Sequence, residues 1–135
     1  MTTRTTALAL CTLFAVSSCG DDDGRGSEAI RRGVGAECGP QLVCEELGQE
    51  CLTEFSAGYC AVRDCAVSAD CPDGSACVTD PDFDGVNYCF LVCLDKPDCN
   101  LDRSPENESE CTSSIDFVDP EAAGALKVCR PSMGS

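Results

Sequence analysis

The chain contains no tryptophan and no histidine, and aromatic residues make up only 5% of its 135 residues. The lack of histidine excludes nucleophile activation and general-base catalysis by that side chain. Carboxylates are abundant, but nothing in the sequence marks one pair as buried, and no G-x-S-x-G nucleophile motif occurs. We therefore expect that the protein is not an enzyme. Because bulky side chains are scarce, the hydrophobic core is small, and the fold needs covalent cross-links to be stable.

Basic residues are few as well. Nine Lys and Arg face 24 Asp and Glu, which gives a formal net charge of −15. Phosphate backbones are bound by clustered Lys and Arg, so this composition excludes a nucleic-acid partner. Cations, especially Ca²⁺, and basic protein surfaces remain as electrostatic partners. The alternative is that the acidic surface only keeps an exported domain soluble.

The first apolar stretch of the chain, Ala7 to Val16, is about ten residues long, whereas a membrane span needs about 20. Its length suits the hydrophobic region of an export signal, and Arg4 precedes it. The stretch runs into Val16-Ser17-Ser18-Cys19. An ordinary signal peptide cut at the small residues is one interpretation of this pattern.

The run that ends at Cys19 also resembles the cleavage site of bacterial lipoprotein signal peptides. That resemblance implies cleavage before Cys19, removal of residues 1–18, and a membrane anchor of acyl chains, palmitate among them, on Cys19. More than one chain gives stable anchoring. Gly20 follows in place of the Asp that retains some lipoproteins at the inner membrane, which favours the outer membrane or the cell surface. Cleavage would remove one basic residue and no acidic one, so the net charge becomes −16.

Cysteine is the residue that the chain has in excess. Apart from Cys11 and Cys19, twelve of its 14 cysteines lie between Cys38 and Cys129, an even number typical of disulfides in an exported domain. They form three units of four, with five residues between the first two cysteines of each unit. This constant gap predicts a duplicated small module. The units are Cys38, Cys44, Cys51 and Cys60; Cys65, Cys71, Cys77 and Cys89; and Cys93, Cys99, Cys111 and Cys129.

The pairing within a unit does not follow from the sequence, because four cysteines allow three pairings. Of these we favour the interleaved one, first to third and second to fourth, because it makes a compact knot with few residues. Closing a loop of about 15 residues is worth about 3 kcal/mol, so disulfides should dominate the stability of the domain. The chain has no C-x-x-C and no histidine, which argues against structural zinc and against a thioredoxin-type enzyme.

The chain divides into a signal peptide (1–18), a flexible acidic and Gly-rich tether (19–37), Cys modules at 38–60, 61–89 and 90–129, and a tail (130–135). Within the tether, residues 27–32 could form a short helical turn that ends at Gly33. Frequent turn signals and brief apolar stretches, such as residues 86–94, predict short strands paired as hairpins. Asp119-Pro120-Glu121 has the residues of a helix start. We expect a small disulfide-rich fold of three tandem modules with little regular secondary structure.

One segment resembles the first half of an EF-hand calcium loop: Asp80-Pro81-Asp82-Phe83-Asp84-Gly85. Asp80, Asp82 and Asp84 would be the metal ligands, with Gly85 permitting the sharp turn. The twelfth position is Leu91, where the family has a bidentate Glu, so a calcium site here would be weak. The alternative is an acidic turn between two disulfide-tied strands. We expect no other cofactor.

As a whole the chain looks like a Gram-negative envelope lipoprotein with tandem cysteine-rich repeats. The stretch from Cys65 to Cys77 is similar to repeats of such surface proteins, and distantly to disulfide modules of the Dickkopf and colipase kind. We expect a lipid-anchored, non-catalytic binding or adhesion module for a protein or glycan. The alternatives are a structural envelope component without a ligand, and an inhibitor of an extracellular hydrolase that uses the loop from Thr112 to Val128.

Overall fold

A computed structural model describes residues 26–134, which form short strands, one short α-helix and single 3-10 turns. No element exceeds six residues, which confirms the predicted small disulfide-rich fold with little regular secondary structure. The elements in chain order are α1 (Glu28–Arg31), β1 (Gln49–Cys51), β2 (Cys60–Arg63), η1 (Ser68–Asp70), β3 (Ser75–Thr79), η2 (Pro81–Phe83), β4 (Tyr88–Cys93), η3 (Lys96–Asn100), η4 (Pro105–Asn107), β5 (Ser109–Thr112), β6 (Asp116–Phe117) and β7 (Lys127–Pro131).

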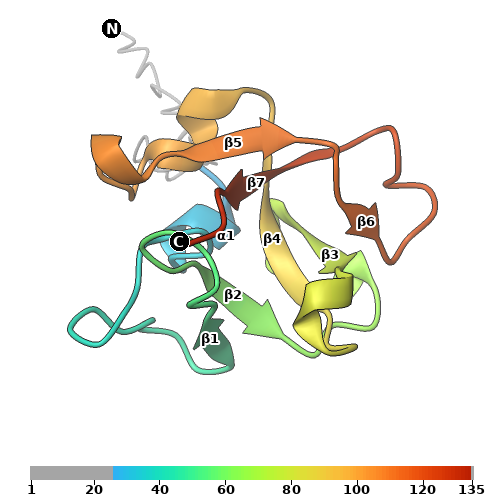
Figure 1. Ribbon diagram of the computed structural model, residues 1–135. Helices are drawn as coiled ribbons and strands as arrows, with labels where there is room; N and C mark the ends of the chain where they lie inside the picture. The colour runs from blue at the N-terminus through green and yellow to red at the C-terminus, as the bar shows by residue number, and fades with distance from the viewer. Residues whose placement is uncertain (1–25, 135) are drawn as a thin grey trace, which may run out of the picture.

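The strands pair in antiparallel fashion around β4, in the order β1-β2-β4-β3-β6, with β7 pairing both β4 and β5 (Figure 1). Five of the six residues of β4 are buried. Its sequence, Tyr-Cys-Phe-Leu-Val-Cys, lacks the polar alternation of a strand with one face in water, as expected for a strand covered on both faces. This strand is the apolar stretch that the sequence predicts within residues 86–94.

The twelve cysteines form six disulfides, and every disulfide joins the first to the third or the second to the fourth cysteine of one unit. This confirms the interleaved pairing. The bonds are Cys38–Cys51, Cys44–Cys60, Cys65–Cys77, Cys71–Cys89, Cys93–Cys111 and Cys99–Cys129.

The structure also shows what one unit of the repeat is. In each unit the third and fourth cysteines lie directly opposite each other on two paired strands, which are β1 and β2, β3 and β4, or β5 and β7. The first two cysteines precede these strands and bond to them. A unit is therefore a pair of antiparallel strands with one preceding loop, held by two disulfides.

The three units share one sheet and one core. The first residues of β4 pair with β2 of the first unit, and its last residues pair with β7 of the third. Five aromatic rings pack at centroid distances of 4.6–6.1 Å at the centre of the molecule. They belong to Phe55, Tyr59, Phe83, Tyr88 and Phe90. The Tyr59 hydroxyl accepts a hydrogen bond from Leu91 N–H at 3.0 Å, and its burial raises the pKa of Tyr59.

The helical turn predicted within residues 27–32 is present as α1. The Ser27 hydroxyl accepts a hydrogen bond from Ile30 N–H at 3.5 Å at its start. However, residues 27–37 do not form a free tether as expected, because Ala29 and Val34 are buried and Gly35 N–H donates to Cys60 C=O at 2.9 Å. These small apolar side chains cover one end of the core. The signal peptide, Cys19 and the tether as far as residue 25 lie outside the described residues.

The C-terminal residues also belong to the folded body. β7 continues to Pro131, and Ser56 N–H donates to Ser132 C=O at 2.9 Å. Gly134 N–H donates to Glu54 C=O at 2.7 Å, so the predicted tail at 130–135 packs on the first unit as far as residue 134. None of the helices in residues 26–134 has the length and apolar character that a membrane crossing requires.

The segment with the residues of a helix start, Asp119-Pro120-Glu121, forms hydrogen-bonded turns in place of a helix. Its Asp119 carboxylate accepts a hydrogen bond from Ser68 N–H at 2.7 Å, at the first residue of η1. Hydrogen bonds from Ser68 lower the pKa of Asp119. Asp119 thus caps another unit's helical turn, a contact between residues far apart in the chain.

A buried arginine ties the third unit to the first. Arg103 is 8% exposed and donates to four backbone carbonyls at 2.7–3.2 Å, those of Gly35, Ser56, Gly58 and Asn107. Burial lowers the pKa of the Arg103 guanidinium. All four acceptors are neutral carbonyls, so this cation is held by backbone dipoles from the segment before Cys38, the first unit and the third unit.

Candidate binding cleft

The predicted calcium ligands do not converge in the structure. Asp80 is 9% exposed; its carboxylate accepts from Asp82 N–H at 2.9 Å and pairs with the Arg130 guanidinium at 3.2 Å. Asp82 and Asp84 are exposed. Among residues 26–134, the only groups of three potential ligands within 4.8 Å of one another are cysteines that form the disulfides. The segment therefore has the geometry of an acidic turn capped by Asp80, and calcium binding stays a prediction without a formed site.

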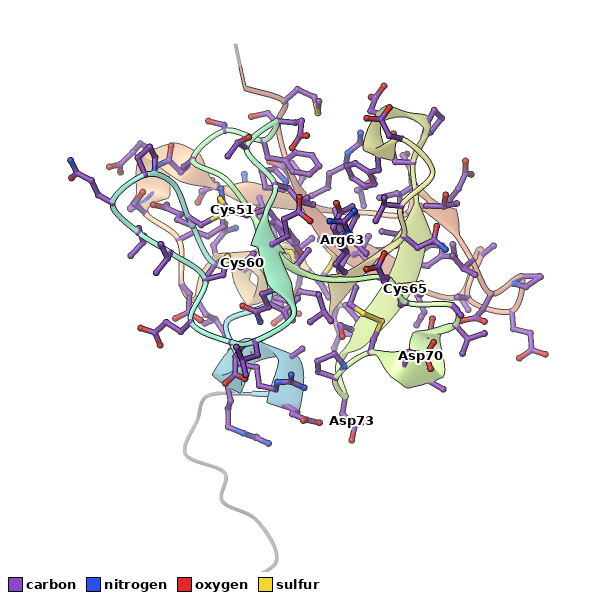
Figure 2. The ribbon with its side chains drawn as sticks, turned by 90° about the horizontal axis from the view of Figure 1, so that it is seen from below. Cys51, Cys60, Arg63, Cys65, Asp70 and Asp73 are labelled. Atoms are coloured by element: carbon purple, nitrogen blue, oxygen red, sulfur yellow. A yellow bond between two sulfur atoms is a disulfide. The ribbon has the colours of Figure 1, made fainter. Side chains whose placement is uncertain are left out.

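The loop between the first two cysteines differs among the three units. In the second unit it carries η1, where the Asp70 carboxylate accepts from Ala66 and Val67 N–H at 2.9 and 3.2 Å. Figure 2 shows Asp70 on this short helical turn, which follows Cys65. In the third unit Asp98 accepts from the two equivalent N–H groups at the same distances. Each aspartate immediately precedes the second cysteine of its unit, so one side chain closes the loop in both.

The first unit lacks these hydrogen bonds because two of its residues differ from those of the other units. Val43 stands at the position of the aspartate and offers no acceptor. Pro40 stands where the second N–H donor would be, and proline has none. The loop consequently contains no helical turn and is held at its start by a bridge between Gly39 and Leu42.

The open loop and the residues that follow Cys44, together called the 39–48 loop, expose apolar side chains to solvent. The exposed fraction is 57% for Leu42, 73% for Val43 and 95% for Leu47. Two disulfides, through Cys38 and Cys44, nevertheless fix its course. A monomeric domain seldom exposes neighbouring large apolar side chains, and a patch of them with a polar rim marks an interaction surface.

Between this loop and α1 lies a cleft of about 590 Å³. Ile30 lines it from α1, Leu42 and Val43 from the loop, and Leu101 from the segment that follows η3. Figure 2, which views the molecule from below, shows the blue α1 and the blue-green loop that precedes β1 on this side. The cleft thus has apolar walls supplied by three separate parts of the chain.

Charged side chains surround these walls. The lining includes two basic side chains, Arg31 of α1 and Arg32 at its end, and four carboxylates, those of Glu37, Glu45, Glu46 and Asp102. Burial opposes the ionisation of Glu37, but hydrogen bonds from Ser104 N–H and Oγ outweigh it, so the pKa of Glu37 is lowered. This carboxylate therefore stays charged beside the apolar walls.

No family model matches this chain, and neither a curated protein nor a solved structure does so. The function must therefore be inferred from the geometry of the residues themselves.

The sequence predicted the cysteine framework but not the cleft. The signal for the open loop was present, since an Asp precedes the second cysteine of the second and third units and a Val precedes that of the first. The opposite wall carried no such signal, because Ile30 lies in the segment that the sequence predicts as a tether, and nothing in the sequence connects it to Leu101 in the third module.

Proposed function

We propose that this chain is a lipid-anchored envelope protein that binds a partner protein, without catalysis, through the cleft beside the 39–48 loop. The observation that carries the proposal is the apolar, solvent-exposed loop held rigid by two disulfides next to a cleft with apolar walls. A loop that is already ordered loses little conformational entropy when it binds. None of the described residues that line the cleft is aromatic, so they offer no ring on which a sugar could stack, which favours a protein partner over a glycan.

The location rests on two supports. Six disulfides suit an oxidising compartment outside the cytoplasm. The lipoprotein-like run that ends at Cys19 supplies the anchor. Seven residue steps separate Cys19 from Gly26, and at about 3.6 Å per residue they span at most about 25 Å. The domain would therefore stay close to the membrane, and its partner would be a protein that reaches that surface.

The anchor is tested by the intact mass of the protein extracted from membranes, measured with and without reduction. We expect a mass that begins at Cys19 and includes acyl chains, with twelve thiols that react only after reduction. A species that carries no acyl chain would refute the anchor.

The cleft is tested by photocrosslinking in intact cells. A photoreactive residue placed at Leu42 should give a discrete adduct with one partner, identified by mass spectrometry. The matched control is Leu94, which is 86% exposed and does not line the cleft. Adducts of equal yield from both positions, or from neither, would contradict binding at the cleft.

Inhibition of an extracellular hydrolase is a second candidate, favoured by the same exposed and disulfide-fixed loop. The segment that the sequence suggests for that role, Thr112 to Val128, includes β6, which pairs with β3, so part of it belongs to the sheet. Inhibition assays on purified proteases test this candidate. Inhibition that Leu42→Asp abolishes would support it, and cleavage of the loop without inhibition would oppose it.

A further inference from the structure

We infer that the cleft takes a basic segment of the partner protein, in which a lysine or arginine packs its aliphatic stem on the apolar walls and brings its charge to the surrounding carboxylates. This inference rests on the proposed function, because it names the chemistry of the partner for the same cleft.

The first argument is the surplus of negative charge at the cleft. Four carboxylates line the cleft against two basic side chains, Arg31 and Arg32. Arg32 lies 3.5 Å from Glu28 and 3.7 Å from Glu46, so its charge is already compensated, whereas Arg31 has no carboxylate of residues 26–134 within 4.0 Å and offsets one negative charge. Glu45 and Asp102 have no basic side chain within 4.0 Å in the described part of the chain, and neither has Glu37, although the charge of Arg103 helps to lower its pKa. An acidic ligand would be repelled at these positions, and a cation would find carboxylates without a competing ion pair.

The second argument is the combination of these carboxylates with apolar walls. Long basic side chains are amphipathic, with an apolar stem and a charged end that stays near polar groups. Leu42, Val43 and Leu101 offer the stem a surface, and all three are more than half exposed. A small inorganic cation would use the carboxylates alone and would leave this apolar surface in water.

The third argument is an acceptor without a donor. Gln49 lines the cleft, and its Nε2 donates to Arg32 C=O at 2.7 Å. Its Oε1 is buried, and no donor of residues 26–134 reaches it. A basic side chain or a backbone N–H of the ligand would satisfy this oxygen only if neighbouring side chains moved to expose it.

The net charge of the whole molecule also favours a basic ligand. With a net charge of −15, the protein attracts basic surfaces over several ångströms and accelerates their association. Overall attraction alone is not specific, so a test must separate it from the cleft.

The experiment uses the protein as it exists after export, purified in detergent, and three short synthetic peptides: one with Lys and Leu, one with Glu in place of Lys, and one with Ser in place of Leu. Binding is measured by isothermal titration calorimetry. We expect only the Lys–Leu peptide to bind saturably. Its affinity should fall as the salt concentration is raised from about 0.05 M to about 0.5 M.

Two variants and one matched control locate the site. Glu45→Gln with Asp102→Asn should weaken binding by about fivefold. Leu42→Ser should weaken it by about tenfold. The control, Asp84→Asn with Glu106→Gln, removes the same two charges at exposed positions outside the cleft and should leave the affinity unchanged.

The possible failures are distinguishable. Equal weakening by the control and by the cleft charge variant would show that only overall charge acts, and would overturn the inference. Binding of the Glu–Leu peptide that Leu42→Ser abolishes would also overturn it, while leaving the cleft as a protein-binding site. Absence of any peptide binding, together with a Leu42 adduct in cells, would refute the basic segment and retain the proposed function.

Discussion

Arg103 should contribute more to stability than any other charged side chain in the described part of the chain. Three of its four hydrogen bonds to carbonyls join the segments before Cys38 and after Cys51 to the third unit, and the fourth, to Asn107, lies within that unit. A hydrogen bond that involves a charged group is worth about 1.5–3 kcal/mol net, but burying a cation without a paired carboxylate costs several kcal/mol. The two effects oppose each other, so the bonds cannot simply be added.

We expect Arg103→Ala to lower the free energy of unfolding by about 3–5 kcal/mol, because buried carbonyls that lose their donor cost about 1–3 kcal/mol each, and the removal of a buried cation offsets part of that loss. The disulfides keep the variant close to its native topology, so it should remain folded enough to measure. Arg103→Lys should lose roughly half as much, because an ammonium has three donors on one atom and cannot span four carbonyls around a planar fork.

The assay is urea unfolding of the oxidised protein, followed by circular dichroism. The control is Arg63→Ala, since Arg63 is half exposed and pairs with Glu50 at 3.3 Å and Asp64 at 3.5 Å. Such surface pairs contribute about 0–1 kcal/mol. A loss for Arg103→Ala that is no larger than that for Arg63→Ala would refute the reasoning, as would a lysine variant as stable as the wild type.

Three further changes test single contacts. Asp70→Ala should lower the free energy of unfolding by about 1 kcal/mol, because two backbone N–H groups lose their acceptor; an unchanged urea midpoint would contradict this. Glu37→Gln should lower the melting temperature at pH 7. The folded-state pKa of Glu37 lies below its ordinary value of 4.5, so the deficit should persist above that pH and vanish as the pH falls through the folded pKa; a deficit that remains in acid would argue against the Ser104 contact. Asp80→Asn should cost about 1–2 kcal/mol through its ion pair with Arg130, and Asp82→Asn less than about 0.5 kcal/mol. Equal losses in thermal melts, together with stabilisation of the wild type by added calcium, would instead restore the calcium loop.

The framework of the fold could be predicted because cysteine spacing is a local property of the sequence. The repeated five-residue gap identified the units, and the interleaved pairing followed the preference for a compact knot. Strand β4 could be predicted for the same reason, since its apolar run is contiguous. In each case the determining residues lie within one short stretch.

The rest of the structure depends on contacts between distant residues, which spacing does not encode. Nothing near Arg103 indicates that its side chain is buried against carbonyls 45–68 positions earlier in the chain. Ala29 and Val34 resembled parts of a tether because their neighbours are Gly, Arg and Glu. Their burial becomes evident only when the core that they cover is known. Asp80 likewise resembled a calcium ligand until Arg130, fifty residues later, was found at its carboxylate.

Under the proposed function, the three units divide stability and recognition between them. In the second and third, an aspartate closes the loop between the first two cysteines, and the loop is compact. In the first, Pro40 and Val43 remove both the donor and the acceptor, and the same two disulfides hold an open loop in place. The duplicated framework therefore keeps the first unit folded although its loop contributes little packing of its own. Because the disulfides supply the stability that the loop does not, its apolar side chains can remain in solvent, where a partner protein can reach them.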